Sequence, residues 1–497
     1  MILTIYDLSG IQNFIFSTNK LKEIIGASKI VSMALFENIP DLLGEDREKW
    51  KKERFSFESG DEKKIVYIGG GNALMVFDSE NTEKEFTKNL SEKIFLQSGG
   101  AIRLCAASII LAENESLAEN QRKLMEKLDA EKKKSGNLLP SLCAPFVAYD
   151  NNNYEALVYE NGECMTRSRR AKLNAYALQS TAFRGVLPDN KKFATEFDKF
   201  AKDGEKNYLA IIHIDGNTMG IKIREFVESL KTTIIPSFDE MKNLSVKISE
   251  LYKEVLKETA STVFKETDGE LPFRPIIADG DDITVMLDSH YAFKFVETFF
   301  ENLNGKEIFG EGFVPTAAAG IVFSKIKFPF SKAYEIAEEC CKNAKSKTLE
   351  REGRAKNSVD FQMIYSGVNE NLKATRKAYY EINDDAALVN LIRRPYVFDS
   401  ESKYSYEKYK EISQTVSGLM KSKAIARTKL KGLRNAYGGG KTEAENYLIY
   451  IKSHTKSEKE VKAAKTLENI FNENSEAILF DYLDIMDIAL EGDETHE

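Results

Sequence analysis

The stretch Pro275-Ile-Ile-Ala-Asp279-Gly280-Asp281-Asp282-Ile-Thr-Val-Met-Leu287 places a turn with acids between two apolar runs. This order is typical of a β-hairpin and predicts two antiparallel strands with carboxylates at their tip. Another apolar run, residues 208–214, ends at Asp215. Three carboxylates at strand ends are the ligands that two divalent cations, Mg²⁺ or Mn²⁺, need to hold a triphosphate and a hydroxyl in line. The sequence therefore predicts a phosphoryl-transfer palm with Asp215, Asp281 and Asp282 as catalytic metal ligands.

The N-terminal part of the chain repeats this pattern without the hairpin acids. Residues 2–6 form an apolar run that ends at Asp7, and residues 66–77 form an apolar stretch with a turn in its middle. An offset of 210 places the turn Gly69-Gly70-Gly71-Asn72 on the acidic turn, so that three of its positions lose their carboxylates. Residues 102–110 then correspond to residues 314–322, and an amphipathic helix rich in Lys and Glu follows each.

Two βαββ units in the same order predict an α+β fold with two ferredoxin-like palm domains. We expect the first palm at residues 1–115 and the second at residues 206–395. Residues 116–205 lack strand periodicity and are expected to form a mainly helical inter-palm domain. Residues 396–497 have a helical pattern that breaks at the three glycines 438–440, and are expected to form a helical C-terminal domain.

The composition narrows the class of protein. The chain has 497 residues, of which 42% are hydrophobic and 30% charged, and no apolar run approaches the length of a membrane span. Five cysteines, an odd number with Cys340 and Cys341 adjacent, favour the reducing cytoplasm over a disulfide framework. The net charge of −8 does not attract nucleic acid, so any RNA contact requires a local basic patch or partner proteins.

Several motifs resemble those of the Cas10 family, the large subunit of type III CRISPR effector complexes. The opening Asp7-Leu-Ser9-Gly10-Ile11-Gln12-Asn13-Phe14-Ile15-Phe16, with Ile25-Gly26-Ala27-Ser28 after it, is similar to the first palm of that family. The acidic turn resembles the G-G-D-D hairpin of the second palm, with Asp279 in place of the first glycine. Further similar segments are Gly320-Ile-Val-Phe, Pro329, residues 337–345 and Asn357-Ser358-Val359-Asp360-Phe361.

The resemblance implies a synthase that joins ATP units 3′ to 5′ and closes them into cyclic oligoadenylates in antiviral defence. One ATP is then expected on the second palm as the donor, and the other against the glycine turn of the first palm. The implied partners are other type III effector subunits with guide RNA and target RNA. No membrane partner is expected.

Nucleotide-binding roles follow as expectations. Backbone N–H groups where the strand ending at Asp215 turns into a helix are suited to cradle phosphates. Lys345 is placed like the family lysine that reaches the triphosphate, and Asp279 adds negative charge beside the metals. The expected nucleotide-binding residues are Gly216, Asn217, Gly220, Gly280, Lys345, Ser9, Gly69, Gly70 and Gly71.

Two departures from the family are expected. None of the histidines, His213, His290, His454 and His496, is followed by Asp, so no HD-type nuclease is expected in this chain. Between the palms, Cys143 and Cys164 have no C-x-x-C motif and no histidine near them, so a zinc site is not expected.

A basic stretch near the C-terminus, with Lys429 and Arg434, is either a solvated helix face or a surface for RNA or partner proteins. Two alternatives to a synthase also stay open. One is an assembly subunit of a type III-like complex that binds nucleotide without turnover, and the other is a stand-alone nucleotide cyclase. Intact Asp215, Asp281 and Asp282 favour turnover, because a copy without catalytic function is free to lose its acids, as the first palm has done.

Overall fold

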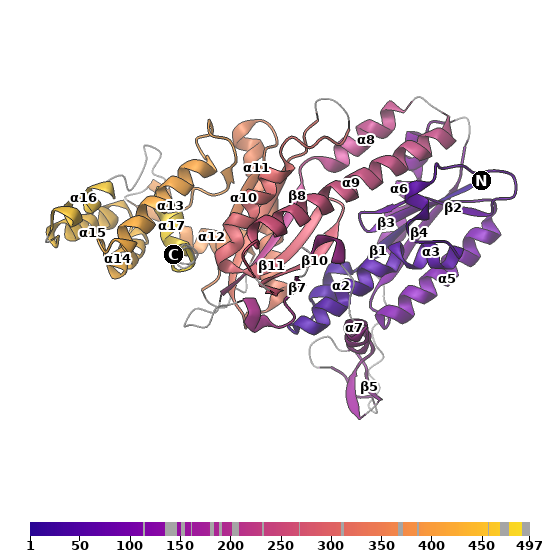
Figure 1. Cartoon of the computed structure of the whole chain (residues 1–497), viewed down its shortest axis with the longest axis horizontal. Helices are drawn as coiled ribbons and strands as arrows, with labels where there is room; N and C mark the ends of the chain where they lie inside the picture. Colours follow the sequence, from indigo (N-terminus) through magenta and orange to yellow (C-terminus); the bar gives the residue numbers. More distant parts are fainter. Residues whose placement is uncertain are drawn as a thin grey trace.

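In the computed structural model, two sheets follow one another along the molecule, and a group of helices lies beyond the second sheet (Figure 1). The predicted α+β architecture with two palm sheets is confirmed. The structure describes residues 1–112, 115–134, 147–150, 155–160, 162–178, 183–187, 191–200, 208–230, 233–267, 269–309, 313–365, 371–384, 387–455, 457–467 and 477–489.

The first palm has a four-stranded sheet in the order β2-β3-β1-β4, with β1 antiparallel to both neighbours. This is the strand order of a ferredoxin-like βαββαβ fold. Its elements are β1 (Ile2–Ser9), α1 (Ile11–Phe16), α2 (Leu21–Phe36), α3 (Asn38–Leu43), α4 (Lys49–Lys52), β2 (Lys63–Gly69), β3 (Asn72–Phe77), α5 (Glu80–Ser98), β4 (Arg103–Ile110) and α6 (Leu117–Lys134).

The second palm repeats this order as β10-β11-β8-β12 and extends it with β13 and β16. Two helices, α8 and α9, lie between its first strand and the hairpin. Its elements are β8 (Tyr208–Gly216), α8 (Met219–Ser229), α9 (Ile234–Val263), β10 (Phe273–Asp279), β11 (Asp282–Asp288), the 3-10 turn η3 (Ser289–Tyr291), α10 (Ala292–Leu303), β12 (Ala317–Lys325), α11 (Phe330–Glu352), β13 (Ser358–Met363) and β16 (Tyr396–Val397).

Between and after the palms lie smaller elements. The inter-palm segment, expected to be mainly helical, also contains an antiparallel pair, β5 and β6. Each of these strands has four residues, which is too short for a period-two pattern to stand out. The elements are β5 (Leu157–Glu160), β6 (Glu163–Thr166), α7 (Arg167–Ala177), η1 (Arg184–Val186), β7 (Lys192–Phe193), which pairs with β9 (Glu270–Leu271), and η2 (Phe197–Phe200).

After β16, the elements that the structure describes in the C-terminal region are helices, and α14 and α15 meet at residues 438–440, where the sequence predicted a break. Buried ion pairs tie it to the second palm: Arg394 contacts Asp481 at 2.9 Å and Asp484 at 3.3 Å. Its elements, from the end of the second palm onward, are α12 (Leu372–Tyr380), β14 (Glu381–Asp384), β15 (Ala387–Asn390), α13 (Tyr406–Lys421), α14 (Arg427–Tyr437), α15 (Lys441–Ser453), α16 (Glu458–Thr466) and α17 (Phe480–Ala489).

The strand registers confirm the internal repeat residue by residue. Each hairpin has a β-bulge at the same place, between Ile65 and Tyr67 in the first palm and between Pro275 and Ile277 in the second. A bulge is a specific feature of a strand pair, so its recurrence supports a common origin of the two units.

The predicted correspondence between the fourth strands of the two palms, β4 and β12, needs one correction. Cys105 lies opposite Asp7, and Ala318 lies opposite Asp215, so Cys105 corresponds to Ala318 and not to Ala317, as the sequence comparison had it. Both strands are runs of small and apolar residues, and such a run fixes a register poorly without its partner strand.

The two palms share one hydrophobic core. Ile24 and Ala27 of α2 lie in the same buried cluster as Ile276 of β10 and Tyr334 of α11. A hydroxyl-to-backbone hydrogen bond from Ser28 to the carbonyl of Ile276, 2.5 Å long, joins the same surfaces. The hairpin tips of both sheets are therefore held side by side.

Candidate active site

The acids of the second palm lie at the tip of the β10–β11 hairpin and at the end of β8. Ile283 pairs with Ile214 in the register of β11 and β8, so the next residues, Asp282 and Asp215, stand opposite each other. We call residues 279–282 the acidic tip and the corresponding residues 69–72 of the first palm the glycine tip. The structure thus places the three predicted metal ligands at neighbouring strand ends.

Gly216 allows the closest approach in the site. A Cβ atom built on Gly216 would lie 2.5 Å from Oδ2 of Asp281 and 2.9 Å from its Cβ. A separation below 3.0 Å is not tolerated by real side chains, so only glycine permits Asp281 to lie against β8. The predicted role of Gly216 therefore includes making room for a carboxylate.

Lys345 of α11 reaches the acids. Its Nζ donates a hydrogen bond to Oδ2 of Asp215 at 2.5 Å and another to the carbonyl of Gly216 at 2.7 Å. Helix α11 can place it there because Gly320 on β12 has no side chain: a Cβ at that position would lie 2.0 Å from the carbonyl oxygen of Ala337. The close packing of α11 on β12 therefore allows Lys345 to reach Asp215.

Burial and mutual repulsion disfavour the charged forms of the hairpin acids. Burial, followed by the charge of Asp215, raises the pKa of Asp281 to about 6. Burial and the charges of Asp215, Asp279 and Asp281 raise the pKa of Asp282 to about 8. One oxygen of Asp282, Oδ1, is buried without a hydrogen-bond partner, although its side chain as a whole is 43% exposed. A bound cation would relieve the repulsion between carboxylates clustered in this way.

Two aromatic residues near Asp282 were not predicted. His213 of β8 accepts or donates a hydrogen bond at 3.0 Å with Thr284 and lies 3.6 Å from Asp282. Burial lowers the pKa of His213 to about 4, so the ring is neutral at pH 7. Tyr334 of α11 packs edge-on against His213, and its buried hydroxyl has no hydrogen-bond partner. The sequence signal was weak, because His213 is a single polar residue inside an apolar strand.

A cavity of about 450 Å³ lies between the two tips and is lined by both palms. The first palm contributes Gly10, Ile11, Gln12, Asn13 and two residues of the glycine tip, Gly70 and Gly71. The second palm contributes Asp279, Asp281 and Asp282. Ser9 is not among the lining residues: it pairs with Arg103 where β1 lies beside β4. Its neighbours in the same motif, Gly10 to Asn13, face the cavity instead.

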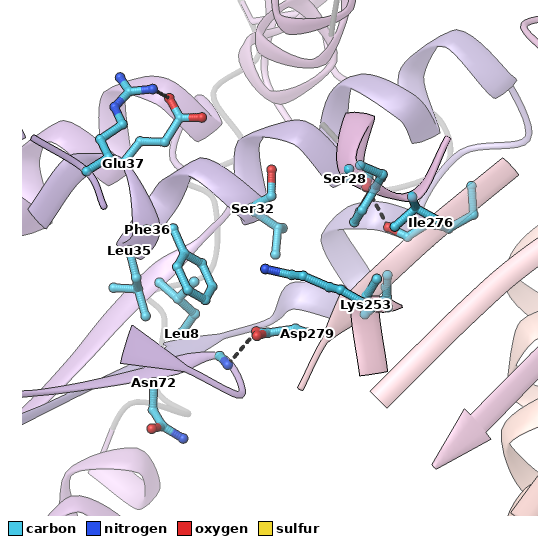
Figure 2. A pocket seen from close by; sticks show the side chains of 18 of the residues that line it. Leu8, Ser28, Ser32, Leu35, Phe36, Glu37, Asn72, Lys253, Ile276 and Asp279 are labelled. Carbon is cyan, nitrogen blue, oxygen red and sulfur yellow. Dashed lines mark hydrogen bonds and ion pairs between the residues drawn. The ribbon is translucent and has the colours of Figure 1, made fainter. Parts of the chain in front are cut away.

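Asp279 does not point at the expected metal position. Its carboxylate accepts hydrogen bonds from the N–H groups of Gly70, at 2.9 Å, and Gly71, at 2.6 Å. Figure 2 shows one hydrogen bond that Asp279 accepts from the turn next to Asn72. Burial raises the pKa of Asp279, while these two amides and the ammonium of Lys253 oppose that rise. Asp279 therefore does more than add negative charge beside the expected metal ligands, where its charge helps to raise the pKa of Asp282: its carboxylate also binds the other palm.

A second cavity, of about 580 Å³, lies on the far side of Asp279. Figure 2 shows Lys253 of α9 extending across it toward Asp279, with Phe36 and Ser32 of α2 on the opposite wall. The ammonium of Lys253 lies 5.7 Å from the centre of the Phe36 ring. The two cavities thus meet at the contact between the tips.

The remaining predicted nucleotide-binding residues of the second palm have different surroundings. Asn217 is buried, and its amide donates to Thr316 and to the carbonyl of Lys356, both at 3.0 Å, so it fastens the end of β8 to β12 and β13. Gly220 is exposed on α8 with open space around it. Gly280 has φ 62° and is the turn residue of the acidic tip.

The first palm keeps an ion pair equivalent to that of Lys345. Lys132 of α6 contacts Asp7 at 2.9 Å. Lys132 and Asp7 occupy the same positions in the first palm as Lys345 and Asp215 in the second, as judged from the registers of β4 and β12. Because α6 packs on β1 and β4, a boundary beyond residue 134 suits the first palm better than the proposed one at 115.

Lys429 and Arg434 lie on α14, at the end of the molecule opposite the first palm (Figure 1). Lys429 donates to the carbonyl of His454 at 3.3 Å, and Arg434 lies over the ring of Tyr365, 4.6 Å from its centre. They are not part of the hairpin site.

The described part of the chain also bears on metal and membrane binding. There, no three His, Cys, Asp or Glu side chains are already gathered as a metal cluster. Within the same ranges, Cys105, Cys340 and Cys341 are buried and Cys164 is exposed, whereas Cys143 lies outside them. No helix of the described residues has the length and apolar character needed to cross a membrane.

Comparison with known proteins agrees with this geometry. Residues 208–358 match the family model of the Cas10/Cmr2 second palm domain. A search of curated proteins gave no match. The crystal structure of a Csm1–Csm4 cassette in complex with cA4 is 15% identical, with a TM-score of 0.55, and the match covers 98% of this chain and 70% of that chain.

Two further solved structures show the same likeness. A Csm1–Csm4 cassette in complex with cA3 gives 14% identity and a TM-score of 0.57, with 99% and 69% of the two chains covered. A cassette in complex with one ATP gives 16% identity and a TM-score of 0.55, with 99% and 70% covered. Residues 208–358 are therefore similar to the second palm domain of the Cas10/Cmr2 family, and the chain has the fold of these cassette structures over nearly its whole length.

Proposed function

We propose that this chain is a nucleotidyltransferase that joins ATP into cyclic oligoadenylates as part of type III CRISPR antiviral defence. The observation that carries the proposal is the cavity between the tips, which is lined by Asp279, Asp281 and Asp282 of the second palm and by residues 10–13 of the first. The third proposed ligand, Asp215, lies opposite Asp282 at the end of β8. The solved relatives, which share the fold, are complexes with ATP, cA3 and cA4, which supports the same substrate class.

The residues at the acidic tip fit divalent cations. Their donors are carboxylate oxygens, which suit Mg²⁺ or Mn²⁺, and the buried Oδ1 of Asp282 lacks a partner. Asp215, Asp281 and Asp282 would hold the cations. When bound, the cations would polarise the reacting phosphoryl group and activate the attacking 3′-hydroxyl.

The chain's own residues then bind and orient two nucleotides. Lys345 holds a positive charge at the end of β8, beside the acids, where it can balance a triphosphate. The donor ATP lies over the second palm, and the acceptor lies against residues 10–13 of the first palm. Placing a hydroxyl and a triphosphate in one cavity removes much of the entropic cost of their reaction.

We also propose that the chain acts with other effector subunits. The solved relatives are complexes of Csm1 with Csm4, and one of them is part of a type III-A CRISPR–Csm interference complex. The basic helix α14 is the proposed surface for RNA or partner proteins, at a distance from the acids. Replacing Lys429 and Arg434 by Glu would then lower RNA affinity in a salt-dependent manner.

Two alternatives would give different results. An assembly subunit without turnover would bind ATP and form complexes but yield no product. A stand-alone cyclase would be fully active without partner subunits or RNA.

The experiment that separates them is mass spectrometry of the products from ATP with Mg²⁺ or Mn²⁺, for the purified chain and for its reconstituted complex with target RNA. Cyclic oligoadenylates from the wild type, and none from an Asp281→Ala/Asp282→Ala variant, are expected. Equal products from both would contradict the site, and bound ATP without product in the activated complex would favour the assembly subunit.

A further inference from the structure

The glycine tip of the first palm is shaped to bind an anion. Gly70 and Gly71 have φ of 62° and 73°, so two successive residues are left-handed. Such residues turn consecutive N–H groups toward the same point and create a small anion-binding concavity. In the acidic tip, by contrast, only Gly280 has a positive φ among the corresponding turn residues.

The anion that fills this concavity belongs to the protein. Oδ1 of Asp279 accepts from Gly70 at 2.9 Å and Oδ2 accepts from Gly71 at 2.6 Å, so each oxygen has its own amide. Hydrogen bonds to an ionised acceptor are shorter and stronger than neutral ones. A phosphate could use the same two amides only after Asp279 had left them.

The two hydrogen bonds of Asp279 hold the hairpin that carries the proposed metal ligands Asp281 and Asp282. Asp279 is the last residue of β10 and pairs with Asp282, the first residue of β11. On its other side, Asp281 lies against Gly216 of β8. The acidic tip is therefore held from two directions, by the sheet of its own palm and by the amides of the other palm.

We propose that Asp279 is a positioning residue: its carboxylate fastens the acidic tip to the amides of Gly70 and Gly71 and thereby holds Asp281 and Asp282 in place. The glycine tip then serves as a receptor for the acidic tip and not for a nucleotide phosphate. We call this contact between Asp279 and the two amides the lock. Its catalytic consequence rests on the proposed function, whereas the lock itself does not.

The lock is tested by hydrogen exchange of the amides of Gly70 and Gly71, measured in peptides that cover residues 66–75. Asp279→Asn keeps the size of the side chain and removes the charge and one acceptor. It is expected to speed the exchange of these amides about tenfold or more, since one of the two protecting bonds is lost and the other no longer has a charged acceptor. Glu254→Gln is the matched control, because it removes a charge from the rim of the 580 Å³ cavity and leaves both amides bonded.

The catalytic consequence is tested by kinetics in the same variants, at temperatures where all are folded. Asp279→Asn is expected to lower kcat about tenfold and to change the KM for ATP by less than about threefold, because positioning of the acids is lost while the cavity remains. Asp279→Glu, which keeps the charge on a longer side chain, is expected to recover part of kcat.

Several results would overturn the lock. One is unchanged exchange of the two amides in Asp279→Asn. Another is tighter ATP binding by Asp279→Asn, together with faster exchange in the wild type when ATP is added, which would make the concavity a phosphate site that Asp279 blocks. A wild-type chain without activity but with protected amides would contradict the proposed function and leave the lock standing.

Discussion

The two palms of this chain share one arrangement of strands and helices but differ at their hairpin tips. Both contain four strands in the same order, with a β-bulge at the same place in the hairpin. In both, a lysine on the helix after the fourth strand pairs with the aspartate near the end of the first strand. They differ where the hairpin turns: one tip carries amides and the other carboxylates. Each tip supplies what the other lacks, and the hydrogen bonds of Asp279 join them.

The ion pairs show what this comparison teaches. Lys132 with Asp7 persists in a palm whose tip has no acids, so an aspartate–lysine pair alone does not mark a metal site. The acids of the tip are the distinguishing feature. If the pair in the first palm supports the fold and the pair in the second also serves catalysis, matched substitutions in the two palms will have unequal effects.

The largest expected difference is at the tips. Asp281→Ala/Asp282→Ala is expected to lower synthesis by about 10³-fold or more, roughly 4 kcal/mol, because two proposed metal ligands are lost. Asn72→Ala, at the position of the first palm that corresponds to Asp282, is expected to change the rate by less than about fivefold. The measurement is initial-rate kinetics with ATP, and similar losses from both would contradict the division of roles.

The next difference is in packing. A Cβ on Gly26 of α2 would lie 1.8 Å from the carbonyl of Lys172, and one on Gly320 would lie 2.0 Å from that of Ala337. Each change to Ala is expected to lower the free energy of unfolding by about 3 kcal/mol, because backbone must move in both cases. Urea unfolding would measure the loss, provided that the transition is two-state.

Only Gly320→Ala is also expected to reduce synthesis in the protein that remains folded, because it shifts α11 and with it Lys345. Equal loss of activity in folded Gly26→Ala would show that the two palms are mechanically one unit.

A smaller difference is expected at the lysines. Lys345→Met is expected to lower kcat/KM for ATP about 30-fold, roughly 2 kcal/mol, since a positive charge beside the triphosphate is lost. Lys132→Met is expected to lower it less than about threefold. Steady-state kinetics over a range of ATP concentrations measures both. A comparable loss in Lys132→Met would place the first palm's ion pair in the catalytic machinery.

The smallest expected effect is a pH dependence that arises where the inter-palm segment packs on the first palm. Lys172 of α7 is buried against Phe14, with its ammonium 4.5 Å from the ring centre, and burial lowers its pKa to about 8. Between pH 8 and the ordinary lysine pKa of about 10.5, the unfolded chain binds one proton more than the folded chain. Stability is therefore expected to rise with pH across this window, by about 1–2 kcal/mol between pH 8 and 10.

The measurement is urea unfolding at several pH values, with Lys172→Met as the control that lacks the titrating group. The slope should be steeper in the wild type than in the variant. Equal slopes would show that Lys172 keeps an ordinary pKa in the folded protein.

Much of the fold was predictable from local pattern. The hairpins, the repeat and the order of elements follow from apolar runs and turn residues, which act within a few residues of sequence. Three acids on strand ends were predicted for the same reason, since register places Asp215 opposite Asp282. The sequence did not predict the β5–β6 hairpin, and it placed the correspondence between β4 and β12 one residue away from the observed one. Short or uniformly apolar strands depend on partners distant in sequence.

The sequence by itself determined two palm units, and it determined that only one of them has acids to offer a metal. The tertiary structure decided where those acids are held. Asp279 looked like an additional charge at a metal site, but its carboxylate binds Gly70 and Gly71, about two hundred residues earlier in the chain. The direction of a side chain at a hairpin tip depends on what faces the tip, and that partner exists only once the two sheets have packed on their shared core.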